Sequence, residues 1–282
     1  MPASLSKLAN LGQHATPLSA AAAKRAHHLL VVLHKSAKPD ARAPHASLLD
    51  AVLARRKRKF ADLGKSPLSA DAGNGALVAW VMIDVVQSTF EKHTAMRKAL
   101  GLLLAEEPQQ IDIAVLGDAG TRQALAELAV YTAWVNGIKL PVRKKENKIK
   151  YLRNIVLHGY ADKSGFAALR AQAEGNVLCR ELTVLPPNEL TPGVYRERIK
   201  ALAKPYGWTR EEYDFKRLRK MGAGAFCAVA QGSDERDAAI VHLQYRHADA
   251  KMTVALVGKG ICFDTGVTIS SPRAICRACM KT

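Results

Sequence analysis

ALVAWVMIDVVQSTFEKHTAMRKALGLLLAEEPQQIDIAVLG, residues 76–117, is the stretch that decides the fold. Its two apolar runs, 76–84 and 111–116, predict buried strands. Between them, apolar side chains recur at helical spacing and predict a helix over 88–106. The buried stripe of this helix is Met96, Leu100, Leu103 and Leu104. A strand, a helix and a second strand in this order indicate an α/β domain with a largely parallel or mixed sheet.

The same alternation continues on both sides of this stretch. The further predicted elements are a strand over 29–33, a helix over 45–55, a helix over 121–136 and a strand over 151–157. Asp118 is placed to cap the third of these elements, and the composition of residues 65–75 predicts turns. We therefore expect an amino-terminal α/β domain over 29–160, preceded by a loose or partly helical segment over 1–28.

The second half of the chain begins after a predicted boundary at 159–165. A long helix is expected over 166–185, where Pro186 and Pro187 stop it. A second helix is expected to start at Thr191-Pro192, because threonine caps well and proline suits the first helical position. The remaining predicted elements are a short helix over 216–221 and strands over 225–230, 240–245 and 253–257.

The charge of the chain is strongly positive. It has 42 Lys and Arg against 25 Asp and Glu, a net charge of +17. Such a balance suits contact with nucleic acid, an anionic surface or acidic substrates. Two local concentrations stand out, Arg55–Lys59 and 139–150. Basic residues also occur along the whole chain, which favours a charge spread over the surface.

No signal for secretion or membrane insertion is visible. Ala20–Ala23 is followed at once by Lys24 and Arg25, so no apolar core of a signal peptide forms. The longest apolar run, 76–83, is too short to span a bilayer. Five cysteines form no disulfide framework, and the single CxxC, Cys276 and Cys279, lacks the second pair that a zinc site requires. We expect a soluble cytoplasmic protein with reduced thiols and no membrane partner.

The stretch VALVGKGICFDTG, residues 254–266, contains the strongest candidate ligand site. A predicted strand leads into Gly258-Lys259-Gly260, and Asp264 follows five residues after the lysine. Ligands of open α/β sheets gather at the carboxyl ends of strands. A lysine and a carboxylate there could form an ion pair, a phosphate contact or a metal site. Spacing alone favours a glycine turn with a surface lysine, and no phosphate-loop, GxGxxG or GxSxG motif is present.

Three motifs together resemble one family. VGKGICFDTG (257–266) resembles the metal-binding signature of the M17 leucyl aminopeptidase, or cytosol aminopeptidase, family. LPPNELTP (185–192) resembles the stretch that opens that family's catalytic domain, and MGAGA with VAQGS (221–225 and 229–233) resembles the segment between them. The motifs occur in the family's order. The resemblance is clear over 179–266 and fainter before it.

The resemblance implies a metalloaminopeptidase that releases amino-terminal residues, of leucine type, from peptides. It implies two divalent metal ions, manganese or zinc, with Lys259 and Asp264 as metal ligands; it assigns no catalytic residue. The metals would polarise the scissile carbonyl, activate a water and hold the free amine of the substrate. The family also implies a cytoplasmic homohexamer, and some of its members are thought to bind DNA.

The resemblance stops abruptly after Gly266. Val267 stands where the family has a glycine, Ser271 where it has a second lysine, and Thr282 where it has a further aspartate ligand. Two of the five usual protein ligands are then present. We expect a partial α/β catalytic domain over 166–266 and an aberrant tail over 267–282, read from a shifted frame or a disrupted gene. This truncated chain is expected to be inactive, with a weakly stable second half. The alternative is a basic nucleic-acid-binding or oligomer-forming protein without catalysis.

Overall fold

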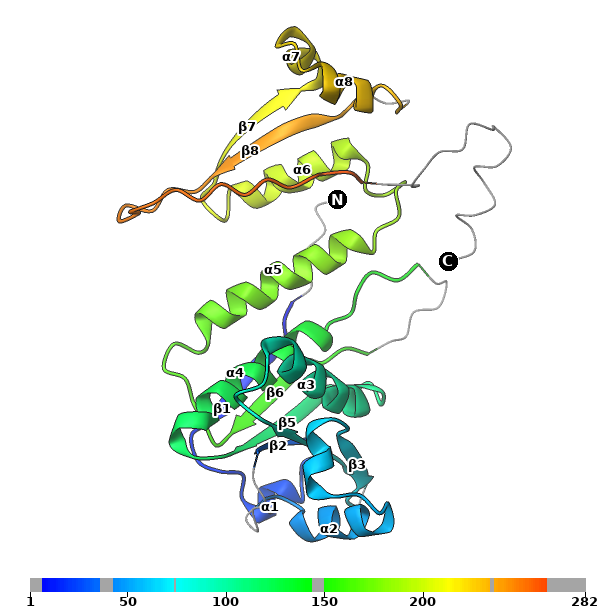
Figure 1. Cartoon of the computed structure of the whole chain (residues 1–282), viewed down its shortest axis with the longest axis vertical. Helices are drawn as coiled ribbons and strands as arrows, with labels where there is room; N and C mark the ends of the chain where they lie inside the picture. The colour runs from blue at the N-terminus through cyan, green and yellow to red at the C-terminus, as the bar shows by residue number, and fades with distance from the viewer. Residues whose placement is uncertain (1–6, 36–42, 74, 144–149, 234–235, 263–282) are drawn as a thin grey trace, which may run out of the picture. The chain divides into compact units, whose positions relative to one another are not determined.

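The computed structural model describes residues 7–35, 43–73, 75–143, 150–233 and 236–262. These residues fall into two compact units, one up to Thr183 and one from Val184 onward. Figure 1 labels the helices and strands of both units. None of the helices in the described ranges combines the length and the apolar composition that crossing a membrane requires.

The first unit is built on a six-stranded sheet. Its strands are β1 (Asn10–His14), β2 (His28–His34), β3 (Leu68–Asp71), β4 (Leu77–Ile83), β5 (Gln110–Leu116) and β6 (Asn154–His158). They lie in the order β1-β6-β5-β2-β4-β3, and only the pair of β3 with β4 is antiparallel. The predicted α/β class with a largely parallel sheet is confirmed, and the apolar runs at 29–33, 76–84 and 111–116 supply its central strands.

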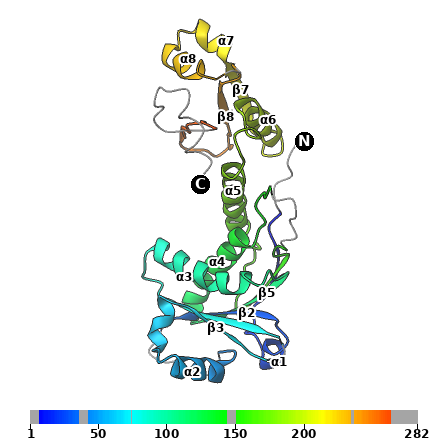
Figure 2. The ribbon, with the colours of Figure 1, turned by 90° about the vertical axis from the view of Figure 1, so that its right-hand side faces the viewer.

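Helices cover both faces of this sheet, as Figure 2 shows. The helices are α1 (Ala20–Ala23), α2 (Ala46–Arg55), the 3₁₀ turn η1 (Phe60–Gly64), α3 (Thr89–Leu104), α4 (Ala119–Asn136) and α5 (Ala167–Thr183). One buried cluster joins the sheet to α3, α4 and α5 and contains Trp134, whereas the other joins it to α1 and α2 and contains Trp80. Because both faces are covered, the central strands β2, β4 and β5 are mostly apolar, although β5 contains Gln110 and Asp112.

Capping residues set the helix starts that the sequence predicted. The Ser88 hydroxyl accepts a hydrogen bond from the Glu91 N–H, and the Glu91 carboxylate accepts one from the Ser88 N–H, which is a capping box. Asp118 accepts from the Thr121 N–H at 2.8 Å, as predicted. The exposed basic run at 55–59 follows the end of α2, and the Arg58 guanidinium donates to the carbonyls of Asp62 and Ser66.

Two strands of the first unit were not predicted. β1 lies within the segment 1–28 that we expected to be loose, and its backbone pairs with β6 along its full length. β3 lies within the turn-rich segment 65–75 and pairs with β4. Both are edge strands with partly exposed, polar sequences, so they lack the apolar run that marks a buried strand. Helix α5, which begins after the boundary expected at 159–165, packs on α4 in the first unit.

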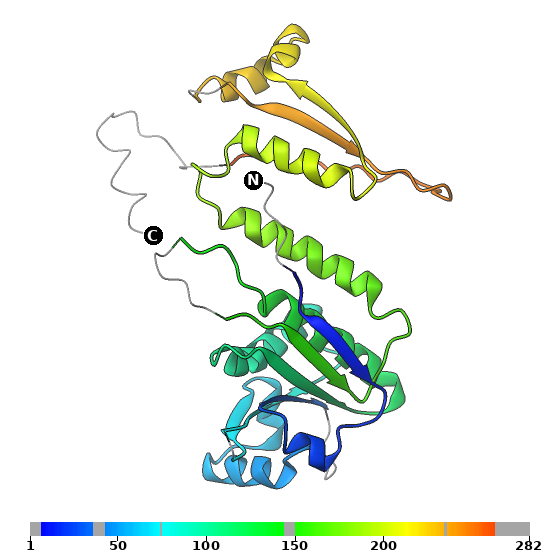
Figure 3. The same ribbon diagram turned by 180° about the vertical axis from the view of Figure 1, so that it is seen from behind.

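The second unit contains α6 (Pro192–Ala203), β7 (Thr209–Asp214), α7 (Phe215–Lys220), α8 (Gly224–Ala230) and β8 (Ala239–Gln244). β7 and β8 form an antiparallel pair (Figure 3). The strand predicted over 240–245 is confirmed as β8. The strand predicted over 225–230 is wrong, because this alanine-rich segment forms α8, and alanine has the highest helix propensity.

The strand predicted over 253–257 is also wrong. This segment is extended but pairs with no strand among the described residues, since β8 bonds only to β7 there. Its apolar side chains face solvent, and Leu256 and Val257 are 92% and 98% exposed. The buried residues described in this unit are few: Leu190, Ala203 and Leu218.

Candidate metal centre

Lys259, the first of the two predicted metal ligands, is exposed in the irregular segment that follows β8. This segment turns back after β8 and passes α6 (Figure 1). A side-chain carbon placed at Gly260 would come within 3.9 Å of Tyr195 Cε1 on α6. Nothing lies within 4 Å of the same position at Gly258. The described part of the signature therefore passes α6 at Gly260 and has open space at Gly258, on the amino-terminal side of Lys259.

Asp264, the second predicted ligand, lies outside the described residues, so its pairing with Lys259 stays a prediction. Cys276, Cys279 and the tail over 267–282 lie outside them as well. Lys259 makes no hydrogen bond or ion pair with another described residue, which leaves its amine free to turn toward a ligand. Across the described ranges, no three His, Cys, Asp or Glu side chains are grouped for metal binding. The described part thus supplies one donor and does not by itself form a metal centre.

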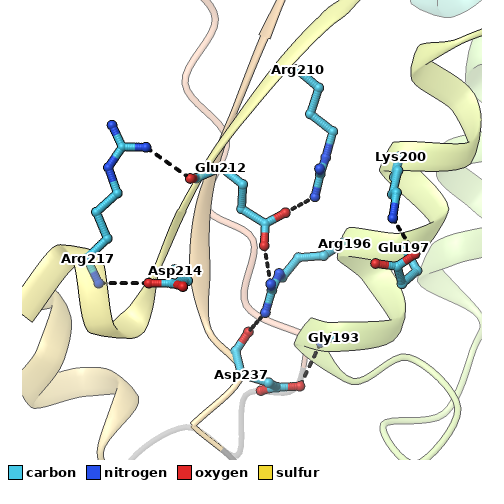
Figure 4. Close-up of polar contacts among 9 residues, drawn as sticks. All are labelled: Gly193, Arg196, Glu197, Lys200, Arg210, Glu212, Asp214, Arg217 and Asp237. Atoms are coloured by element: carbon cyan, nitrogen blue, oxygen red, sulfur yellow. Dashed lines mark hydrogen bonds and ion pairs between the residues drawn. The ribbon is translucent and has the colours of Figure 1, made fainter.

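Asp237, in the loop before β8, holds the start of α6 (Figure 4). Its Oδ2 accepts a hydrogen bond from the Gly193 N–H at 2.7 Å, and its main-chain carbonyl accepts one from Arg196 Nη1 at 2.6 Å. Burial, and secondarily the charge of Asp237, raises the pKa of the Cys262 thiol. Cys262 therefore stays protonated at neutral pH when no cation is bound.

Glu212 on β7 binds two arginines at once. Arg196 from α6 and Arg210 from β7 both form ion pairs with its carboxylate (Figure 4). The three side chains are largely buried, with the Glu212 side chain 16% exposed. A buried carboxylate of this kind requires such partners, because an unpaired charge away from water is strongly unfavourable. The cluster fixes α6, and with it Tyr195, against the two-stranded sheet.

A second polar group joins β7 to α7. Asp214 caps α7 by accepting from the Arg217 N–H at 2.7 Å. The Arg217 guanidinium donates to Glu211 at 2.8 Å and lies 3.9 Å from the centre of the Tyr213 ring. The Arg217 and Tyr213 hydrogen bonds hold the pKa of Glu211 below its usual range, so this carboxylate is ionised at neutral pH. These contacts set the direction in which the chain leaves β7.

The motif at 185–192 forms a turn and a capped helix start. The N–H groups of Glu189 and Leu190 both donate to the Pro186 carbonyl, and the Leu190 side chain is buried. Thr191 accepts from the Val194 N–H and Pro192 occupies the first turn of α6, as the sequence predicted. Of the two further motif segments, 221–225 overlaps the start of α8 and 229–233 overlaps its end.

Sequence reasoning missed the residues that organise this unit. Arg196 lies on α6, Glu212 on β7 and Asp237 in the loop before β8. Glu212 is 16 residues and Asp237 is 41 residues after Arg196. No periodicity connects them. The one available signal was the unusually charged sequence of β7, TREEYD, in a position that turned out to pair with β8.

A family model matches most of the second unit. Residues 177–275 match the family model described as "Cytosol aminopeptidase family, catalytic domain". The chain is 42% identical over 165 residues to the cytosol aminopeptidase of Pseudomonas aeruginosa, covering 55% of this chain and 32% of the relative. It is 42% identical over 107 residues to a probable cytosol aminopeptidase of Synechococcus sp., covering 38% and 22%.

Solved structures share the fold. A tomato leucine aminopeptidase mutant superimposes with a TM-score of 0.66 at 18% identity, covering 93% of this chain and 56% of that one. The bottromycin maturation enzyme BotP, in complex with Mn, gives 0.56 at 22% identity, with 79% and 46% coverage. The chain matches 32%, about a third, of the length of the Pseudomonas aeruginosa relative. Residues 177–275 therefore match the catalytic domain of the M17 cytosol aminopeptidase family, and the chain is similar to members named cytosol aminopeptidases.

Proposed function

We propose that this chain is part of a metal-dependent aminopeptidase that releases amino-terminal residues, of leucine type, from peptides. One observation carries the proposal: the segment VGKGICFDTG lies inside the residues that match the catalytic-domain model. Lys259 is exposed and has no partner among the described residues, which supports the proposal because a ligand lysine needs a free amine.

Lys259 and Asp264 would hold a divalent cation in this proposal. A lysine amine and a carboxylate oxygen suit manganese or zinc, and a relative of known structure contains Mn. A bound cation would polarise the scissile carbonyl and lower the pKa of a bound water. Within this chain, the signature segment passes α6 at Gly260 near Tyr195, and the Asp237 contacts hold the first turn of that helix.

The test is a chimaera that supplies the ligands beyond the signature. Residues 1–266 are joined to the corresponding remainder of the Pseudomonas aeruginosa enzyme, and hydrolysis of a leucine chromogenic amide is measured with added manganese. We expect activity that Lys259→Ala and Asp264→Ala each abolish. Lys251→Ala is the matched control, because Lys251 is an exposed lysine of the same segment. A folded chimaera in which Lys259→Ala keeps full activity would sink the proposal.

The 282-residue chain by itself is tested on the same leucine amide with added manganese. Activity of this chain that is lost in Lys259→Ala would mean that other groups complete the centre. We also propose a cytoplasmic homo-oligomer acting on peptides, by analogy with relatives named cytosol aminopeptidases. Light scattering distinguishes an oligomer from a monomer.

A second candidate function is nucleic-acid binding, favoured by the net charge of +17. Arg55, Arg56, Lys57 and Lys59 are exposed at the end of α2. Part of the second basic concentration, 144–149, lies outside the described residues. Phosphate contacts make affinity fall steeply with salt. Binding to a DNA duplex that is lost with increasing salt and weakened by replacing these four residues would support this function, whereas no binding at low salt would exclude it.

A further inference from the structure

A pocket of about 450 Å³ opens between three helices of the first unit, on the outer side of the buried cluster that contains Trp134. It lies within the size range of small-molecule sites, about 300–1,000 Å³. Phe90, His93, Thr94 and Arg97 recur at helical spacing on α3 and line one wall. Tyr131 and its neighbours on α4 form the second wall, and Arg180 on α5 contributes the third.

The lining of this pocket is positive and contains no carboxylate. Arg97 is exposed and has no hydrogen-bond or ion-pair partner in the described part of the chain. Arg180 donates through Nη1 to the Val135 carbonyl at the end of α4, which holds its guanidinium at the pocket. Burial, followed by the charge of Lys92, lowers the pKa of His93, so the imidazole is neutral at pH 7. The positive charge of the pocket therefore comes from the two arginines.

A neighbouring pocket on the other side of His93 does not have this carboxylate-free, positive lining. That pocket, of about 380 Å³, shares His93 and Tyr131 but also contains Lys92 and Glu127. Its charges are thus mixed, and its Glu127 already accepts from Gln123 at 2.8 Å. A free anion would be attracted less there than on the Arg97 side, because Glu127 offsets the charge of Lys92.

Aromatic surface accompanies the two arginines. Phe90 is 79% exposed on the first turn of α3, although a phenylalanine is usually buried. Tyr131 lies on the opposite wall, with its ring edge-on to His93 at a centroid distance of 5.4 Å. A flat apolar group could cover the exposed Phe90 ring while an attached oxyanion reaches the guanidinium groups, which favour planar, two-point binding of carboxylate or phosphate.

We propose that the pocket between α3, α4 and α5 binds a small oxyanion that carries a flat aromatic group, with Arg97 and Arg180 holding the oxyanion and Phe90 contacting the ring. This site is separate from the proposed peptidase centre in the second unit. It uses none of the residues of the metal signature.

The experiment uses the full chain and adenosine monophosphate as the probe, which carries both a phosphate and an aromatic base. Binding is measured by isothermal titration calorimetry at low salt. We expect saturable binding that is about tenfold weaker or more in Arg97→Gln and in Arg180→Gln, because each removes one charged hydrogen-bond donor. Phe90→Ser should weaken binding by about threefold to tenfold through the loss of stacking. Adenosine and inorganic phosphate, which each lack one half of the probe, should bind more weakly than the intact probe.

Lys98→Gln is the matched control, because Lys98 is an exposed cation next to Arg97 that does not line the pocket. Its affinity should equal that of the unmodified chain. Arg97→Gln is the decisive variant, since Arg97 has no described partner whose loss would unfold the protein. Absence of saturable binding overturns the proposal, as does an Arg97→Gln affinity equal to that of Lys98→Gln.

Discussion

The carboxylate of Asp237 accepts a hydrogen bond from the backbone N–H of Gly193 at 2.7 Å, across 44 residues of sequence. A helix start has unpaired N–H groups, and this aspartate satisfies one of them from outside the helix. A side-chain carbon at residue 193 would lie 2.9 Å from the same carboxylate oxygen, so glycine permits the approach. The loop before β8 therefore holds the first turn of α6.

Asp237→Ala should loosen α6 without affecting the first unit. The change removes the acceptor of the Gly193 N–H, which we expect to lower the local stability by about 1–2 kcal/mol. Hydrogen exchange measured by mass spectrometry should show faster exchange in 192–203 and no change in β2, β4 and β5. Asp249→Ala is the control, because the Asp249 side chain is 90% exposed. Equal exchange of α6 in both variants would contradict this role.

Glu212→Gln should destabilise the second unit more than an exposed carboxylate change does. It leaves Arg196 and Arg210 side by side without a negative partner, and we expect a loss of about 2 kcal/mol. The measurement is the same exchange experiment over β7 and β8. Glu197→Gln, which removes an exposed partner of Lys200, should change little. Similar effects of the two substitutions would show that burial of Glu212 does not matter.

Trp134→Phe should weaken the attachment of β1 to the first unit. The fully buried indole donates to the Ala9 carbonyl at 2.9 Å, and phenylalanine keeps the ring volume in part but leaves this carbonyl unpaired. We expect the free energy of unfolding, measured in urea, to fall by about 1–3 kcal/mol. Trp80→Phe is the comparison, because its bond to the Pro44 carbonyl is longer, at 3.4 Å. Faster exchange at 10–14 should appear in Trp134→Phe only.

The first unit should lose stability in acid through its capping carboxylates. The Thr121 N–H and hydroxyl hold the pKa of Asp118 below its ordinary value in the folded state. The stabilisation is therefore fully present above the unfolded-state pKa and is lost as the pH falls through the folded-state pKa, between about pH 5 and pH 2. Asp118→Asn keeps a capping oxygen without titrating, so its stability should decline less steeply in this range. Asp50→Asn, at an exposed position of α2, should follow the unmodified chain.

The second unit should be cleaved by protease before the first. Its described residues include three buried apolar side chains, Leu190, Ala203 and Leu218, whereas two large clusters stabilise the first unit. Limited trypsin digestion followed by mass spectrometry should leave a resistant fragment ending near residue 183. A chain that resists digestion throughout would show that the second unit is as stable as the first.

The buried parts of the fold could be predicted from the sequence, and the exposed parts could not. β2, β4 and β5 are mostly apolar because helices cover them on both faces. β1 and β7 are half exposed, and their sequences NLGQH and TREEYD carry no such signal. Their pairing partners lie far along the chain, so only the three-dimensional arrangement identifies them as strands.

The candidate site shows the same division. Lys259 was found from a local motif, but the strand predicted before it is absent, because a strand needs a neighbour and β8 is paired only to β7 in the described ranges. The Asp237 and Glu212 contacts bring together residues of α6, β7 and the loop before β8, which local spacing cannot show. Arg97 and Arg180 likewise meet at one pocket only because α5 packs on α4.

The exposed apolar segment after β8 has a consequence for the lifetime of the protein. Met252, Val254, Leu256 and Val257 present an extended, uncharged surface to solvent. Segments of this kind pair readily with the same segment of another copy, and they resemble the stretches that holdase chaperones bind in unfolded chains. Yield on overexpression will therefore depend on protein concentration and on chaperone supply, and quality-control proteases will have a ready point of engagement in this part of the molecule.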